Sequence, residues 1–210
     1  MSNGYRRLTY RAVASPLFNK IGWRASCKLL VKAMQKVLML GCLVAALTPL
    51  PASTLQQLSL DDMIRLSTAI VHGKAQQTVS SYSGSIIYTH YKVQVSETLK
   101  GPAASQLDIA VPGGAANRFQ QTFAGAPILA PGQDYVLFLW TSKSGLTQII
   151  GLSQGLFVVS TNSAGQLMVM RGASTERMVN ATGQPVSDSA MQMLLSDLRS
   201  LIHTTLGGAK

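Results

Sequence analysis

One short segment carries the letters of a hydrolase motif. Residues 151–155 read Gly-Leu-Ser-Gln-Gly, which fits the G-x-S-x-G pattern that presents a serine nucleophile at a strand–turn–helix elbow. Such a serine needs a histidine as base and a carboxylate to orient it. Asp188 or Asp197 followed by His203 supplies both groups in the chain order of α/β-hydrolases. A serine hydrolase that uses Ser153 is therefore one functional alternative.

The residues that flank Ser153 favour a structural role. The run Leu156–Val159 follows at once and is typical of a strand, whereas a nucleophile elbow leads into a helix. Glycine inside a strand pattern indicates a bulge or a bend. We therefore expect Gly151 and Gly155 to shape a joint between two strands, and we assign no catalytic residue.

The other reactive residue types are scattered. The histidines are His72, His90 and His203, and no two of them have the spacing of metal ligands. Both cysteines, Cys27 and Cys42, fall near the N-terminus, so the rest of the chain forms no disulfide. No glycine-rich loop leads into a helix with a lysine, as a phosphate site requires. We expect no metal and no cofactor.

One strand offers a polar face that is suited to binding. Within residues 85–101 the side chains alternate, and Tyr88, His90 and Lys92 share one side. An exposed aromatic and basic strand face binds sugars or single strands in some small barrels. The alternative is an ordinary solvated face. The long loop 115–131 is a second binding candidate, because long loops in compact domains are often functional.

The charge of the chain is unevenly distributed. The formal net charge is +10, but eight of the 18 Lys and Arg residues lie at or before Lys36, and all 8 acidic residues start at Asp61. From Thr54 onward ten basic residues face eight acidic ones, which leaves about +2. Without a basic stripe, this part of the chain is not expected to bind nucleic acid.

Residues 34–53 have the order of a secretory signal peptide. Lys36 precedes the apolar run Val37–Leu47, and small residues follow a Thr-Pro-Leu-Pro break. We expect cleavage after Ala52 or Ser53 and a periplasmic or extracellular mature protein, which touches the membrane only through the signal segment before cleavage. An uncleaved membrane anchor over residues 37–50 is the alternative location.

The first 33 residues are basic and contain no acid. They are either a leader, such as a mitochondrial transit peptide, or an upstream extension of a protein whose translation starts at Met34. The choice between Met1 and Met34 stays open. Residues 54–210 are long enough for a single domain with its own core.

The patterning of residues 54–210 predicts a mainly β fold. Ser59 with Asp61 and Asp62 predicts a helix cap, and residues 132–140 are apolar on both faces, as in a central strand. An amphipathic pattern predicts a C-terminal helix over residues 188–206, capped by Ser187 or Asp188. We expect a small antiparallel barrel of six or seven strands, which include residues 69–79, 106–111, 156–161 and 166–170.

The order of these pieces resembles a known family. The segments "AIVHGKAQ", "YTHYKVQVSETLKG" and "GQDYVLFLW" over residues 60–160 are similar to the netrin-like, OB-type barrel of the tissue inhibitors of metalloproteases. They are also similar to uncharacterised secreted bacterial proteins. The inhibitors use disulfides and a zinc-chelating N-terminal cysteine, which residues 54–210 lack.

The resemblance therefore implies the fold rather than the activity. We expect an exported, non-catalytic binding or interaction module of the bacterial cell envelope, whose partner is an unknown envelope protein or glycan. A protease-inhibitor-like module that docks through its loops is a further alternative. The oligomeric state is left open.

Overall fold

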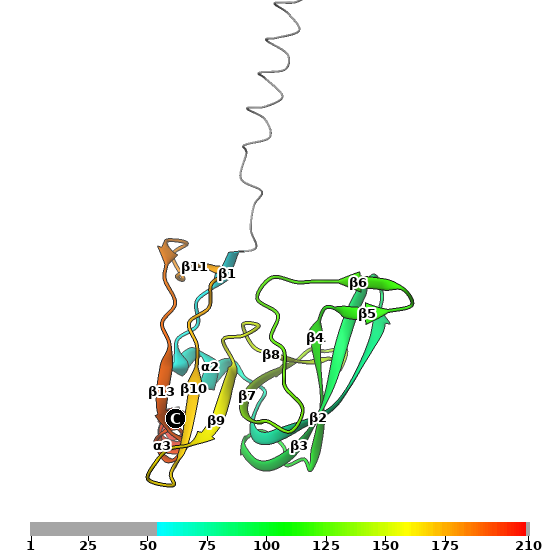
Figure 1. Cartoon of the computed structure of the whole chain (residues 1–210). Helices are drawn as coiled ribbons and strands as arrows, with labels where there is room; N and C mark the ends of the chain where they lie inside the picture. The colour runs from blue at the N-terminus through cyan, green and yellow to red at the C-terminus, as the bar shows by residue number, and fades with distance from the viewer. Residues whose placement is uncertain (1–53, 209–210) are drawn as a thin grey trace, which may run out of the picture. The chain divides into compact units, whose positions relative to one another are not determined.

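The computed structural model describes residues 54–208 of the chain (Figure 1). The predicted leader, signal peptide and cleavage site at Ala52 and Ser53 lie outside these residues. The described residues belong to one compact unit, Ala52–Lys210. None of its described helices is long and apolar enough to cross a membrane.

Most of this unit is one antiparallel sheet, so the predicted mainly β fold is confirmed. The strands run in the order β13–β10–β9–β7–β2–β3–β4, and β8 also pairs with β7. Their bounds are β2 Ala69–Ser83, β3 Ile86–Lys100, β4 Gln106–Pro112, β7 Asp134–Thr141, β8 Thr147–Ile149, β9 Leu156–Thr161, β10 Leu167–Arg171 and β13 Met191–Leu194.

Five of these strands curl toward each other. Along the path β8–β7–β2–β3–β4 every neighbouring pair is antiparallel, so β8 and β4 run parallel to each other. Residues of β4 and β8 lie side by side, but the two strands are not paired. Within residues 54–208 the sheet is therefore open at this seam and forms no closed barrel.

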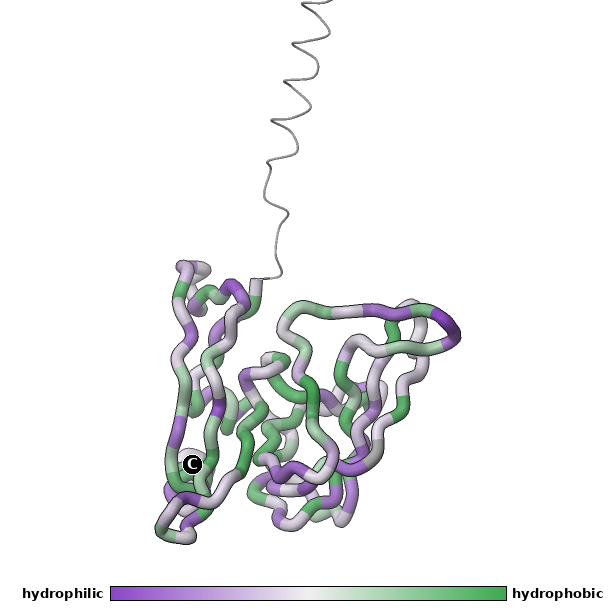
Figure 2. The backbone as a smooth tube through the Cα atoms, in the orientation of Figure 1, coloured by the Kyte–Doolittle hydropathy of each residue, from purple (hydrophilic) through white to green (hydrophobic). Residues whose placement is uncertain are grey.

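Strand β7 separates two apolar cores. All residues from Tyr135 to Leu139 are buried, as predicted for a central strand. Because side chains alternate along a strand, Val136 and Phe138 pack on one side and Tyr135, Leu137 and Leu139 on the other. The first core also holds residues of both helices, and the second holds residues of β3 and β4. Figure 2 shows this concentration of hydrophobic positions in the middle of the sheet.

The N-terminal helix follows its prediction, and the C-terminal helix follows it except at its start. Helix α2, Leu60–Leu66, has a capping box in which Ser59 and Asp62 bond each other's backbone N–H groups. Helix α3 spans Leu195–Gly207, so the predicted start at residue 188 is wrong. The residues before it form β13, whose Met191 and Met193 reach the first core from a strand. The apolar spacing that predicted one helix thus comes from a short strand, β13, followed directly by a helix, α3.

The strands outnumber the expected six or seven, because the main sheet alone has eight and two further small sheets were not predicted. Strands β1 (Thr54–Gln56), β11 (Arg177–Val179) and β12 (Pro185–Val186) form one of them. Strands β5 (Gly114–Ala116) and β6 (Phe119–Gln121) form a hairpin within the loop that follows β4.

Candidate functional site

The G-x-S-x-G segment is a loop between two strands that share a partner. Strands β8 and β9 both pair with β7, and residues 150–155 loop out between them. Phe138 holds both ends, because its C=O accepts from the Ile150 N–H at 2.9 Å and its N–H donates to the Gly155 C=O at 2.9 Å. Gly151 and Leu152 have φ angles of 60° and 58°. The predicted joint between strands is confirmed.

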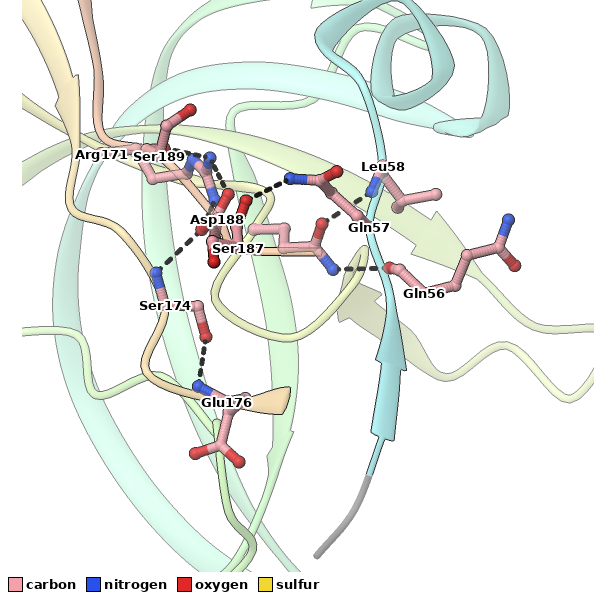
Figure 3. Close-up of polar contacts among 10 residues, drawn as sticks. Gln56, Gln57, Leu58, Arg171, Ser174, Glu176, Ser187, Asp188 and Ser189 are labelled. Carbon is pink, nitrogen blue, oxygen red and sulfur yellow. Dashed lines mark hydrogen bonds and ion pairs between the residues drawn. The ribbon is translucent and has the colours of Figure 1, made fainter. Parts of the chain in front are cut away.

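The side chain of this loop that bonds a distant segment of the chain is Gln154, not Ser153. The Gln154 side chain is 1% exposed. Its Oε1 accepts from the Leu58 N–H at 2.8 Å, and its Nε2 donates to the Gln56 C=O at 3.0 Å (Figure 3). The Gln154 side-chain amide therefore bonds this backbone as a neighbouring strand would, and it attaches the segment before α2 to the loop. The G-x-S-x-G pattern gives no indication of this role of Gln154.

The suggested partners of Ser153 have other neighbours. The Asp188 carboxylate is bound by the Arg171 guanidinium. Asp197 is exposed near the start of α3, and His203 lines a separate cavity beside the same helix. Within residues 54–208 no hydrogen bond joins Ser153 to a histidine or a carboxylate. No cluster of three metal-ligating side chains occurs among the described residues.

The polar row on β3 has the predicted alternation. Tyr88 is half-buried, and Lys92 is exposed. His90 Nδ1 lies 3.0 Å from Asp108 Oδ1 on the neighbouring β4. The row thus carries one acidic neighbour, which lowers its net positive character. Binding by Tyr88, His90 and Lys92 stays a prediction.

The second candidate, the loop 115–131, begins as an ordered hairpin. Strands β5 and β6 are joined by Asn117 and Arg118, whose φ angles are 48° and 70°. Positive φ at both central residues is typical of the tight turns that join twisted antiparallel strands. The turn points Arg118 and the following Phe119 toward solvent, since both side chains are exposed.

The hairpin is tied to the end of the β2–β3 ribbon. Gln121 Oε1 accepts from the Ile87 N–H at 2.7 Å, and its Nε2 donates to the Ser85 C=O at 2.9 Å. Thr89 Oγ1 donates to the Gly113 C=O at 2.8 Å. The Gln121 side-chain amide thus bonds the backbone at the start of β3, where a neighbouring strand would otherwise supply the partner. These three hydrogen bonds attach the hairpin to the β2–β3 ribbon.

The other end of the loop is fixed as well. Leu129 is 1% exposed within the second core. The Ala130 N–H donates to the Tyr135 hydroxyl at 2.8 Å. Burial raises the pKa of Tyr91 above its ordinary value, and Tyr135 nearby adds to the rise. Residues 122–128 therefore form a strap between two anchors, and the phenol beneath it is neutral.

Two cavities border the strap. The loop cavity, about 290 Å³, lies beneath it, and the seam cavity, about 270 Å³, lies between β4 and β8. They share the wall residues Val111, Pro112 and Pro127. The loop cavity adds Tyr91, Phe123 and Ile128, and the seam cavity adds Ala110, Trp140, Ile149 and Leu152. Among residues 54–208 no charged side chain lines either cavity; the seam cavity is lined mainly by apolar groups, and the loop cavity also by the polar groups of Thr89 and Gln121.

Large apolar side chains around the strap are exposed. Ile128 is 85% exposed, Phe119 67% and Trp140 45%. Exposed apolar patches of this kind mark binding surfaces in soluble domains. The sequence predicted the loop but not these side chains. Ile128 and Leu129 stand together among Ala, Gly and Pro residues, and the sequence does not indicate which of the two is exposed.

Comparison of the chain with protein-family models, curated proteins and solved structures gives no match. The local chemistry of the strap and its cavities therefore has to carry the assignment of function. The strap and its cavities offer contact with apolar groups and with uncharged polar groups. This is chemistry for binding. It offers no paired acid and base near a nucleophile.

Proposed function

We propose that the protein is an exported, non-catalytic interaction module of the bacterial cell envelope, which binds through the strap and its two cavities. The observation that carries this proposal is the pair of adjacent cavities without charged side chains, bordered by the exposed Ile128 and Trp140. A site without charged groups lends itself to recognition rather than to acid–base chemistry.

Export is supported by the order of charge and hydrophobicity in residues 34–53. Cleavage after Ala52 or Ser53 would leave β1, which begins at Thr54, intact in the mature protein. An uncleaved anchor over residues 37–50 would keep the same module at the membrane surface. Both arrangements place the strap outside the cytoplasm.

The strand order supports the proposed OB-type, netrin-like relationship. Five strands in the order β8–β7–β2–β3–β4, with β8 and β4 parallel, correspond to a five-stranded, partly open barrel. In that arrangement β3 is the second of the five strands along the chain, and it carries Tyr88, His90 and Lys92. Barrels of this type often bind ligands on this strand. An inhibitor-like role would depend on the strap, because residues 54–210 contain no cysteine.

A photo-crosslinking amino acid at position 128 is expected to capture a component of the envelope in living cells. Ile128 is 85% exposed and lines the loop cavity, so a probe there would contact a bound partner without disturbing the core. The adducts are to be identified by mass spectrometry as protein, glycan or lipid.

The same probe at position 167 provides the matched control. Leu167 is 42% exposed and lies on β10, away from both cavities. Capture from position 128 and not from 167 supports the proposal. Equal capture from both positions, or none from either, contradicts it.

A further inference from the structure

Exposed apolar side chains gather at one end of the described unit. Five of the ten large apolar side chains that are exposed lie on the β2–β3 ribbon near its end, the β5–β6 hairpin and the strap. Figure 1 shows the hairpin beside the joined ends of β2 and β3. Four of them, Tyr82, Phe119, Phe123 and Ile128, form what we call the apolar tip; Val79 lies on the opposite face of the ribbon, beside His90.

The charge of the apolar tip has one sign. Between residues 109 and 133 the only charged residue is Arg118, and residues 75–91 contain no Asp, Glu, Lys or Arg. Arg118 is exposed at the turn of the hairpin, next to Phe119. The tip therefore combines protruding apolar groups with a cation and has no acidic residue within these segments.

The structure holds these side chains in solvent. Gln121 and Thr89 fix the hairpin to β3 and to Gly113, so Phe119 cannot fold back onto the core without breaking those bonds. Exposed apolar surface contributes nothing to folding stability. Its retention on a braced hairpin is readily understood if it is buried on binding.

We propose that the apolar tip docks on an anionic lipid surface; the inference rests on the proposed function and names its ligand. Apolar side chains of a docked protein enter the boundary between headgroups and acyl chains, and a basic residue is attracted to anionic lipids. A lipid surface accepts side chains that protrude from separate turns, whereas a protein partner needs a matched surface of about 800 Å².

Binding of residues 52–210 to lipid vesicles tests this inference. Both apolar cores lie inside this unit, so it is suited to study without the N-terminal segment. Vesicles of phosphatidylcholine alone are to be compared with vesicles that also contain phosphatidylglycerol, by co-sedimentation. Trp140, the single tryptophan after residue 53, gives a second, fluorescent readout. We expect binding to the anionic vesicles that weakens with added salt.

Variants separate the two contributions. The double variant Phe119→Ser with Ile128→Ser is expected to lower the vesicle partition coefficient more than about tenfold, because two apolar side chains are lost. Arg118→Gln is expected to lower it about fivefold on anionic vesicles only. Leu167→Ser is the matched exposed apolar control and is expected to bind like the wild type.

The possible outcomes distinguish this inference from the proposed function. Absence of vesicle binding, or equal loss in Leu167→Ser, overturns the lipid inference. A protein or glycan captured at position 128 without vesicle binding overturns it too and leaves the proposed function standing. If position 128 captures nothing in cells, the proposed function fails even where vesicles are bound in vitro. The melting temperature of each variant is to be measured, and only variants that melt like the wild type are to be compared. Unfolding then cannot imitate lost binding.

Discussion

The variant Asp188→Asn is expected to lower the free energy of unfolding by about 3–5 kcal/mol, because it leaves a buried guanidinium without its counter-charge. Arg171 and Asp188 form a two-pronged ion pair, with Nη1–Oδ2 at 2.7 Å and Nη2–Oδ1 at 2.9 Å. Their side chains are 4% and 2% exposed. Among residues 54–208 the buried Arg171 Nε donates no hydrogen bond, so no other group at that atom compensates for the lost counter-charge. Urea unfolding at neutral pH measures the loss.

The pair also fixes the chain on both sides of the ion bridge. Asp188 Oδ2 accepts from the Ser174 N–H at 2.8 Å, and Arg171 Nη2 donates to the Ser189 C=O at 2.9 Å (Figure 3). The first bond holds the segment that leaves β10, and the second holds the segment that enters β13. Loss of the carboxylate charge therefore weakens two backbone attachments as well as the ion pair.

Two comparison variants make this expectation specific. Asp61→Asn removes an exposed ion pair with Arg65 and is expected to change the stability far less, because solvent screens that pair. The double variant Arg171→Met with Asp188→Leu is expected to regain part of the lost stability, because apolar groups replace the buried charges, although the Ser174 N–H and the Ser189 C=O lose their partners. A loss in Asp188→Asn no larger than that in Asp61→Asn would contradict the structure.

The stability contributed by Asp188 is expected to disappear in acid. Burial raises the pKa of this carboxyl, but the bonds and charge of Arg171 and the Ser174 N–H outweigh it and hold the pKa below its ordinary value of 3.8. The folded pKa is therefore lower than the unfolded one. The contribution is complete above about pH 5 and is lost as the pH falls through the folded pKa. The stability difference between wild type and Asp188→Asn should shrink from about pH 5 to pH 3, as followed by urea unfolding. A constant difference would argue against an ionised Asp188 in the folded protein.

The case of Asp188 shows where reasoning from the sequence ends. Short-range patterns predicted the structures that they determine, such as the cap at Ser59 and the buried strand from Tyr135 to Leu139. Asp188 was instead predicted to cap a helix, because a carboxylate before an apolar period is typical of a helix start. Its actual partner, Arg171, lies 17 residues away across a strand connection. No local pattern indicates such a pairing.

The candidate site divides in the same way. The length of the loop 115–131 predicted a region of interest, and the alternation of β3 predicted a polar row. The cavities depend on β4 and β8 curling toward each other, and on Leu129 fixing the strap. Exposure of Ile128 follows from those tertiary contacts. A sequence reading treats an isoleucine as core by default, so the surface could not be predicted.

The variant Gln154→Ala is expected to lower the free energy of unfolding by about 2–4 kcal/mol. It leaves the Leu58 N–H and the Gln56 C=O without the partners that Gln154 supplies, and it opens a hole at a side chain that is 1% exposed. The segment ahead of α2 should open first, because those two bonds attach it to the β8–β9 loop. Hydrogen exchange of the Leu58 amide measures this local opening, alongside urea unfolding for the whole unit.

Ser153→Ala is the matched control in the same loop, and its stability is expected to change by less than about 0.5 kcal/mol. Its hydroxyl forms no hydrogen bond to a histidine or carboxylate within residues 54–208. The two neighbouring variants thus test opposite interpretations of Gly-Leu-Ser-Gln-Gly. If Ser153→Ala were as damaging as Gln154→Ala, or if Leu58 exchange stayed slow in Gln154→Ala, the loop would not be the clamp that its geometry indicates. If the expected contrast is found, the glutamine is the residue that matters to the fold, and the serine is an accident of the pattern.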